Sequence, residues 1–292
     1  MNCSMRSRVH KGMARALLAA ILIAGLPVTG GAQMIVPVKG TRLDADVFGN
    51  LYVIDGERCT LSMLDTGFVV RMEVGGPGWR PGEFDRPEGI WARNGLDLYV
   101  ADYGNHRIQR FDRALAFVSS LSGRDEGTFG YPMDVALSRL GELFVVDGEN
   151  QRIVKLGTSL PEGVFGGFDA GSGKLHAPSR IAIGPSDRLY VLDGARVVVY
   201  DVFGNFLEEL YEGMWKAPVA IYGDADRLIV GDGGSLFWFG PDNRPLGELR
   251  LSEETRAIGE LRAIAHHGRK LFLLGGRGLA VLADPFAAPG GD

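Results

Sequence analysis

The sequence predicts an all-β fold, a six-bladed β-propeller of four-stranded antiparallel blades, closed by an N-terminal strand that completes the last blade. The first observation is a five-residue pattern that starts with Leu and, in five of its six copies, ends in Asp. The copies are residues 51–55, 98–102, 143–147, 189–193, 228–232 and 271–275. Successive copies begin 47, 45, 46, 39 and 43 residues apart. A period of this length in an all-β pattern is typical of propeller blades.

The second observation is that each repeat divides into four strand-like segments. The first is a short strand of small or apolar residues, which suits a crowded central channel. These strands are 89–92, 134–137, 180–183, 219–222 and 263–265. A turn containing Gly, Asn or Asp leads to the repeated pattern, which forms the second strand. The third strands are also apolar, as expected where blades stack, at 108–111, 153–156, 197–200, 236–239 and 279–282. A more polar fourth strand, such as 68–74 or 206–211, suits an outer edge that must not recruit other chains.

The third observation concerns closure of the ring. Residues 34–38 form an apolar segment that belongs to no complete repeat, and the sixth repeat lacks a fourth strand of its own. We expect residues 34–38 to supply that strand, since Pro37 is tolerated on an outer edge. The predicted organisation is a single propeller domain over 33–285, followed by a flexible tail at 286–292.

Residues 1–32 have the features of a signal peptide. Four basic residues precede an apolar run at 16–28, and small residues follow up to Ala32. We expect cleavage after Ala32 and export to the periplasm or the extracellular space. The mature chain would start at Gln33 and contain no membrane span. An uncleaved N-terminal anchor is the alternative, although the run is short for a bilayer span.

The charge balance argues against a nucleic-acid partner. The chain holds 31 basic and 36 acidic residues, and four of the basic residues but none of the acidic ones lie within 1–32. The remainder therefore has 27 basic against 36 acidic residues, a net charge of −9. Such a chain lacks the basic surface that binds nucleic acid. We expect a monomer that binds a protein, a peptide or a glycan and carries no cofactor.

Two repeats resemble the NHL repeat, which is named after its Asn-His-Leu tripeptide. The second repeat contains Asp-Tyr-Gly-Asn-His-Arg-Ile-Gln-Arg-Phe-Asp at 102–112, and the third contains Asp-Gly-Glu-Asn-Gln-Arg-Ile at 147–153. The linker at 75–90 is similar to the opening of the same repeat. The likeness covers nearly all of the chain beyond the leader and is faint in the last two repeats. It implies a six-bladed propeller but no particular function, because one scaffold hosts many roles.

Arginines recur shortly after the repeated acid. Strand direction puts the linkers between blades on the same face as the turns between second and third strands. These turns carry Arg58, Arg107, Arg152, Arg196 and Arg277. Their guanidinium groups could form a ring that binds carboxylates or other anions. The alternative is that each Arg pairs with the Asp of its own blade or with loop carbonyl groups; Arg277 has no such Asp and is the candidate for a free guanidinium.

The linkers also carry aromatic residues, which could bind a peptide or a glycan where they are exposed. Trp79 and Trp215 are the predicted contact residues. The other linker aromatics are Phe84, Phe129, Tyr131, Phe165 and Phe168. The alternative is that these side chains pack within their linkers and fill the gaps between blades.

No catalytic set can be recognised in the sequence. It contains no Ser/His/Asp constellation and no Gly-rich loop followed by a helix that could bind phosphate. The histidines are scattered over the repeats, so we predict no catalytic residue and no metal site. The favoured function is a binding platform on the linker side. The alternative is a lyase or lactonase with a metal at the axis, because NHL-type amidating lyases and gluconolactonases resemble this chain in fold.

Overall fold

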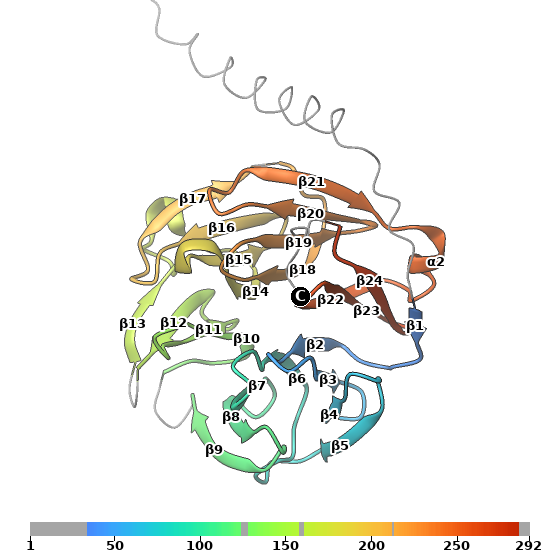
Figure 1. Ribbon diagram of the computed structural model, residues 1–292. Coiled ribbons are helices and arrows are strands. Elements are labelled where there is room, and N and C mark those ends of the chain that lie inside the picture. The colour runs from blue at the N-terminus through green and yellow to red at the C-terminus, as the bar shows by residue number, and fades with distance from the viewer. Residues whose placement is uncertain (1–33, 124–127, 158–160, 212, 286–292) are drawn as a thin grey trace, which may run out of the picture.

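The structure, a computed structural model, describes residues 34–123, 128–157, 161–211 and 213–285. The predicted signal peptide at 1–32 and the predicted tail at 286–292 lie outside the described residues. The described chain forms six four-stranded antiparallel sheets arranged around a central axis (Figure 1). The predicted six-bladed propeller is confirmed.

In each blade, two strands lie toward the axis. The innermost strands are β2 (Arg42–Ala45), β6 (Pro87–Trp91), β10 (Pro132–Leu137), β14 (Pro178–Ile183), β18 (Pro218–Gly223) and β22 (Leu261–His267). The second strands, which contain the repeated pattern, are β3 (Leu51–Asp55), β7 (Asp97–Asp102), β11 (Leu143–Asp147), β15 (Leu189–Asp193), β19 (Leu228–Asp232) and β23 (Lys270–Gly275).

The other two strands of each blade lie toward the rim. The third strands are β4 (Thr60–Leu64), β8 (Arg107–Asp112), β12 (Arg152–Leu156), β16 (Arg196–Tyr200), β20 (Ser235–Phe239) and β24 (Leu279–Ala283). The outermost strands are β5 (Val70–Gly75), β9 (Phe117–Ser122), β13 (Pro161–Phe165), β17 (Phe206–Leu210), β21 (Pro245–Arg250) and, in the sixth blade, β1 (Met34–Val36).

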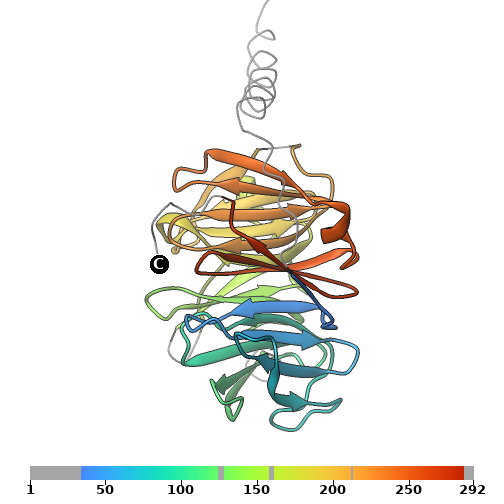
Figure 2. The ribbon, with the colours of Figure 1, turned by 45° about the vertical axis from the view of Figure 1, so that its right-hand side comes forward.

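Strand β1 closes the ring, as the sequence predicts. It pairs antiparallel with β24, with Met34 opposite Val281 and Val36 opposite Leu279. In Figure 2, β1 lies in blue beside the red strands of the sixth blade. The strand ends at Val36, two residues before the predicted boundary. Val38 donates its N–H to the carbonyl of Val36 at 2.9 Å, in a tight turn around Pro37, which has no N–H to continue the ladder.

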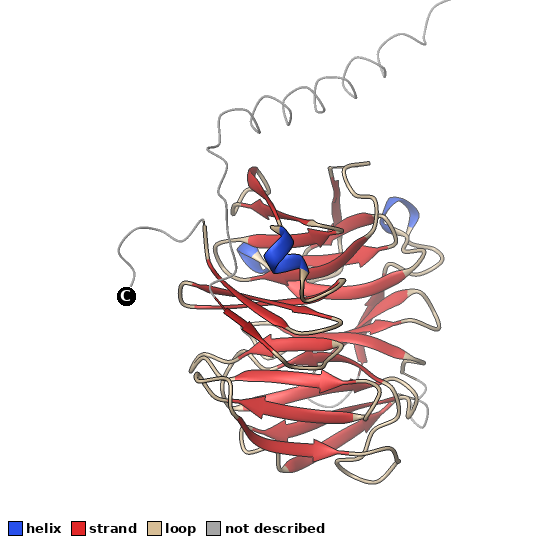
Figure 3. Cartoon of the chain, turned by 90° about the vertical axis from the view of Figure 1, so that its right-hand side faces the viewer, coloured by secondary structure: helices blue, strands red, loops and turns tan. Residues whose placement is uncertain are grey.

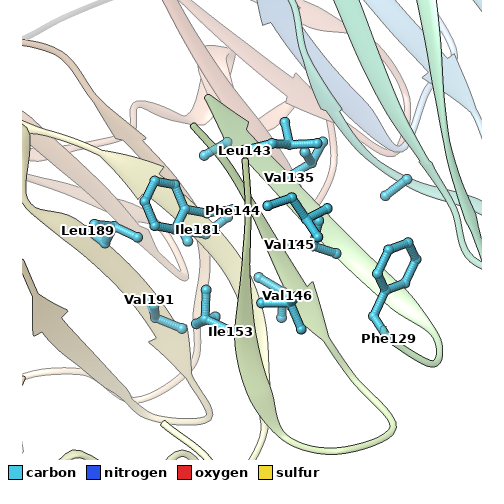
Figure 4. Packing of buried hydrophobic residues seen from close by; sticks show 14 of the residues in the cluster. Phe129, Val135, Leu143, Phe144, Val145, Val146, Ile153, Ile181, Leu189 and Val191 are labelled. Carbon is cyan, nitrogen blue, oxygen red and sulfur yellow. The ribbon is translucent and has the colours of Figure 1, made fainter. Parts of the chain in front are cut away.

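The blades stack through second and third strands that are buried on both faces. All five residues of β11 are buried, which explains why the repeated pattern does not alternate between apolar and polar residues. Phe144 packs toward Ile181 and Leu189 of the next blade (Figure 4). Buried apolar surface contributes roughly 25 cal/mol per Å². Each blade is therefore stabilised by its two neighbours rather than by a core of its own.

The innermost strands carry a register shift near the linker. In the third blade it falls between Pro132 and Asp134, and the same shift recurs in blades two, four, five and six. Such a bulge redirects the neighbouring side chains. Asp134, Arg180 and Arg42 share one register position, opposite the fourth residue of the repeated pattern. Three charged side chains thus occupy equivalent places near the axis.

Helical structure in the described part of the chain is limited to three short segments (Figure 3). These are η1 (Gly171–Gly173), η2 (Pro185–Asp187) and α2 (Glu253–Arg256). Ser252 begins α2, because its Oγ accepts a hydrogen bond from the N–H of Thr255 at 3.1 Å. Within the described ranges, no helix is long and apolar enough to cross a membrane.

Candidate functional site

We define the linker face as the chain between consecutive blades together with the turns between second and third strands. Asp102, at the end of β7, is the centre of a hydrogen-bond network on this face. Its buried carboxylate accepts from Arg107 Nε at 2.8 Å, Asn105 Nδ2 at 2.9 Å and Gln109 Nε2 at 3.1 Å. It also accepts from the N–H of Asp85 at 2.8 Å. Burial raises the pKa of Asp102, whereas the hydrogen bonds from Asn105, the N–H of Asp85 and Arg107 lower it. One carboxylate therefore ties the turn after β7 to the linker before β6.

The same unit recurs in the third and fourth blades. Asp147 accepts from Arg152 Nε at 3.0 Å and from Asn150 Nδ2 at 2.8 Å. Asp193 accepts from Arg196 Nε at 2.9 Å. In blades two, three and four the Arg therefore pairs with the Asp of its own blade. This arrangement is the alternative to a ring of free guanidinium groups. Ligand binding by these arginines stays a prediction.

The remaining guanidinium N–H groups hold the linkers in place. Arg107 donates to the carbonyl of Trp79 at 2.7 Å and to that of Glu83 at 2.8 Å. Arg152 and Arg196 each donate to one carbonyl group in the linker before their own blade, at 3.1 and 2.6 Å. These arginines therefore fix the loop backbone of the linker face.

Arg58 and Arg277 lie outside this pattern. Arg58 is 62% exposed and binds Glu73 of β5, with 2.9 Å between Nη2 and Oε1, instead of the Asp of its own turn. Arg277 forms no ion pair with the described residues, and it lines a surface hollow beside α2 together with Arg256. Of the five predicted arginines, these two present the most guanidinium surface to a ligand.

The two predicted tryptophans lie in opposite environments. Trp79 is 80% exposed on the linker before β6. Trp215 is only 4% exposed, and its ring centroid lies 5.3 Å from that of Phe237 and 5.8 Å from that of Phe239. Trp215 is therefore placed in the core between blades, where it offers almost no surface to a ligand. Phe168, another linker aromatic, is 82% exposed.

An axial cavity of about 50 Å³ lies between the innermost strands. Six charged residues line it: Arg42, Asp44, Arg93, Asp134, Arg180 and Arg262. The volume suits a few water molecules or one small functional group. Four guanidinium groups against two carboxylates make this lining net positive, in a chain whose formal net charge is −5.

At the linker-face end of the cavity, two arginines lie beside a single carboxylate, that of Glu88. Arg42 Nη2 lies 2.6 Å from Glu88 Oε2, and Arg180 Nη2 lies 3.9 Å from the same oxygen. Arg262 Nη1 donates to the carbonyl of Gly40 at 3.0 Å. The Nε of Arg180 is buried and has no hydrogen-bond partner among the described residues. The cavity mouth therefore has more donor capacity than Glu88 uses.

At the opposite end, Arg93 bridges two blades across the axis. Its Nε lies 3.2 Å from Asp44 Oδ1, and its Nη1 donates to the carbonyl of Gly223 in the fifth blade. Its guanidinium carbon lies 4.4 Å from the ring centroid of Tyr222, a cation–π contact. The Arg93 side chain therefore narrows this end of the cavity.

The Asp134 carboxylate accepts hydrogen bonds from backbone N–H groups at the inner edges of two neighbouring sheets. The donors are the N–H groups of Val135 and of Ile181 in the next blade, each at 3.0 Å. An innermost strand is a sheet edge with unpaired N–H groups, and leaving these buried and unbonded would be costly. Burial raises the pKa of Asp134 to about 7, although these N–H groups and Arg42 act in the other direction.

This raised pKa predicts a pH dependence of stability. Because the folded protein binds the Asp134 proton more tightly than the unfolded chain does, its contribution is fully present below about pH 4 and is lost as the pH rises to about 7. Each unit of difference in pKa corresponds to about 1.4 kcal/mol. We expect the free energy of unfolding of the wild type, relative to Asp134→Asn, to fall between pH 4.5 and 7 and then level off. A difference that is constant over this range in urea titrations would contradict the assignment.

The axial arginines were not among the residues predicted from the sequence. Asp134 and Arg180 were expected only as members of a first strand of small or apolar residues. Their charge was the available signal, because an ionised side chain is rarely buried without a partner or a function. Arg42 gave a weaker signal, since the first blade has no predicted innermost strand.

Metal ligands are not clustered in the described part of the chain, where no group of three or more His, Cys, Asp or Glu side chains could hold an ion. His106 lies on the linker face, with its ring centroid 4.2 Å from that of Tyr131. His266 lies at the opposite end of its blade, with Nε2 3.0 Å from Asp284 Oδ2. The structure does not bring these two histidines together.

Comparison with known proteins identifies the repeat and the fold. Residues 84–111, which include the Asp102 network, match the NHL repeat family. The chain is 37% identical over 81 residues to a probable peptidyl-alpha-hydroxyglycine alpha-amidating lyase of Caenorhabditis elegans, a match that covers 25% of this chain and 23% of the relative. It is 26% identical over 148 residues to the protein brain tumor of Drosophila melanogaster, covering 48% of this chain and 14% of the relative. The chain thus spans less than a quarter of the length of either relative.

Solved propellers share the architecture. Virginiamycin B lyase from Staphylococcus aureus superposes with a TM-score of 0.60 at 15% identity, covering 82% of this chain and 79% of that one. A streptogramin B lyase gives a TM-score of 0.59 at 17% identity, covering 82% and 77%. At such identities the likeness shows the fold alone. Six blades of the same topology and the match at 84–111 lead to one conclusion: the chain is a six-bladed β-propeller that contains an NHL repeat.

Proposed function

We propose that the protein is an exported, monomeric propeller that binds a protein or peptide partner through its linker face. The support comes from two aromatic side chains on that face. Trp79, between β5 and β6, is 80% exposed, and Phe168, between β13 and β14, is 82% exposed. Large aromatic side chains supply much of the binding energy in protein interfaces. These two exposed aromatic side chains support the linker face as the binding face.

The backbone beneath Trp79 is held in place, and this is the observation that carries the proposal. The carbonyl of Trp79 accepts a hydrogen bond from Arg107 Nη1 at 2.7 Å, and the carbonyl of Arg80 accepts one from Nη2 at 3.0 Å. Arg107 is in turn paired with the buried Asp102. A contact residue on a loop that is already ordered loses less entropy on binding. The Arg–Asp units therefore act as the support of the binding face.

Phe168 adds a chemical preference. The Nζ of Lys174 lies 4.2 Å from the centroid of the Phe168 ring, so a cation stands beside an exposed apolar surface. Such a pair suits a partner that presents an apolar side chain next to an acidic one. Trp79 supplies a second apolar contact on the same face, in the linker between the first and second blades.

A double variant, Trp79→Ala with Phe168→Ala, tests the proposal. In a pull-down from an extract of the cell envelope, we expect this variant to recover at least ten-fold less partner than the wild type. Truncating an interface aromatic residue costs about 2 kcal/mol or more of binding free energy. Phe203→Ala is the matched control, since Phe203 is also 80% exposed but lies in a turn between third and fourth strands, on the opposite face.

The pull-down contradicts the proposal if the double variant recovers the same partners as the wild type, or if Phe203→Ala loses them. Recovery of a glycan instead of a protein would support the linker face as the binding face but contradict the proposed class of partner. The export part of the proposal has its own measurement, because N-terminal sequencing of the secreted chain should start at Gln33.

A lyase acting at the axis is the second candidate. Two observations favour it: the axial cavity is lined by arginines, and several proteins similar to this chain are named as lyases. Metal analysis of the purified protein separates the two candidates. A stoichiometric zinc or calcium ion would favour the lyase, whereas loss of partner binding in the aromatic double variant would favour the binding platform.

A further inference from the structure

The cavity mouth between Arg42, Arg180 and Arg262 is not needed for the linker-face contacts proposed above. Innermost strands start at the linkers, so this end of the cavity opens on the linker face. The side chains of Arg42 and Arg180 are 15% and 14% exposed, which leaves them accessible while largely out of bulk water. In such a setting a charged group interacts more strongly than at an open surface.

We propose that Arg42, Arg180 and Arg262 form a binding site for the carboxylate group of a ligand, in competition with the carboxylate of Glu88. Guanidinium groups bind planar carboxylates through two parallel N–H donors. Here Arg42 and Arg180 both lie beside the Glu88 carboxylate, and Arg262 lines the same cavity. Arg180 offers Nε, which has no partner among the described residues, together with Nη2, which lies 3.9 Å from Glu88. These two N–H groups are a donor pair of the spacing that a carboxylate accepts.

The shape of the cavity restricts the ligand. A space of about 50 Å³ admits a carboxylate and a few bonded atoms, but no whole metabolite. Arg93, bridging to Gly223, narrows the far end. The ligand therefore inserts a terminal carboxylate from the linker face and leaves the rest of its body outside the axis.

Glu88 is the resident competitor. Its Oε2 already binds Arg42 Nη2 at 2.6 Å, so an entering carboxylate must share or displace it. Two carboxylates in one small site repel each other. Replacing Glu88 by Gln should therefore strengthen binding, whereas removing an arginine should weaken it. Opposite effects from two neighbouring residues are not expected of a purely structural ion pair.

The experiment uses matched probe pairs that differ only in charge. N-acetylglycine is compared with N-acetylglycinamide, and glucuronate with glucose, by following the Nε–H resonances of Arg42 and Arg180 in the full chain labelled with ¹⁵N. We expect the acids to give saturable shifts and the neutral partners to give none. Preference for N-acetylglycine would point to a peptide terminus, and preference for glucuronate to a sugar acid. If acid and neutral probes behave alike, the proposal is overturned.

Three variants complete the test. Glu88→Gln should tighten N-acetylglycine binding at least three-fold, and Arg180→Lys should weaken it at least ten-fold, because Lys keeps the charge but loses the planar donor pair. Arg250→Ala is the control, since Arg250 is 83% exposed and lies on the outermost strand β21. Weaker binding in Glu88→Gln, with unfolding unchanged from the wild type, would overturn the proposal.

The axial carboxylate site can be tested independently of the proposed linker-face function. The double variant Trp79→Ala/Phe168→Ala should keep the resonance shifts of Arg42 and Arg180, because neither aromatic residue lines the axial cavity. Loss of partner with shifts retained would leave both proposals intact, while loss of shifts with partner retained would remove the axial site alone.

Discussion

Replacing Asp102 by Ala should lower the free energy of unfolding by about 3–5 kcal/mol, the range for breaking a buried ion pair by removing one partner. The carboxylate is fully buried and accepts four hydrogen bonds, one of them from Arg107, which is only 13% exposed. Without Asp102, the guanidinium and the amides of Asn105 and Gln109 lose an acceptor that water cannot fully replace. Urea unfolding of the two proteins measures the difference.

Asp232→Ala is the matched control for this prediction. Asp232 holds the same repeat position in the fifth blade, where Gly233, Gly234 and Ser235 follow it and no Arg pairs with it within the described chain. Its carboxylate accepts only the N–H groups of Lys216 and Ala217, at 2.8 and 2.9 Å. We expect a loss of about 1–2 kcal/mol. Equal losses for Asp102→Ala and Asp232→Ala would show that the Arg–Asp pair adds nothing.

The second large effect is expected at the axis. Asp44→Ala should cost about 3 kcal/mol, because Asp44 is buried, pairs with Arg93 at 3.2 Å, and accepts the N–H groups of Ala45 and Ala92. Arg93 is held on the other side by Gly223 and Tyr222, so it cannot move out to water without breaking contacts between opposite blades. Stability of the single and double variants gives the coupling free energy.

In the Arg93→Ala background, Asp44→Ala should cost at least 1 kcal/mol less than in the wild type, since no guanidinium is then left without its partner. The free energy of unfolding that is still lost measures the hydrogen bonds from the N–H groups of Ala45 and Ala92 to Asp44. Additive effects of the two substitutions would contradict the view that Arg93 and Asp44 act as a pair.

The sequence predicts the architecture well because each blade repeats one local pattern. Leu, an aromatic or aliphatic residue, Val and Asp fix the second strand, and the leftover segment beginning at Met34 finds the one blade that lacks an outer strand. The pairing of Arg107 with Asp102 follows from spacing within a single turn. Such features depend on residues that are close in sequence.

Features that depend on several blades were not predictable in the same way. Arg42, Glu88 and Arg180 come from three blades and meet only because the ring closes and a bulge redirects the side chains near the linker end of the innermost strands. Likewise, Trp79 and Trp215 both lie in linkers, but only Trp215 reaches aromatic neighbours on the next blade. Composition alone cannot separate a linker residue that faces solvent from one that fills a gap.

The central claim is that the linker face is the binding face. Its most direct measurement is photo-crosslinking in cells that produce the protein, with a benzophenone amino acid placed at position 79 or at position 203. Both positions are 80% exposed in the native chain, so chance encounters should be equal. We expect a discrete crosslinked partner from position 79 and none from position 203. Equal crosslinking from both positions, or crosslinking from position 203 alone, would contradict it.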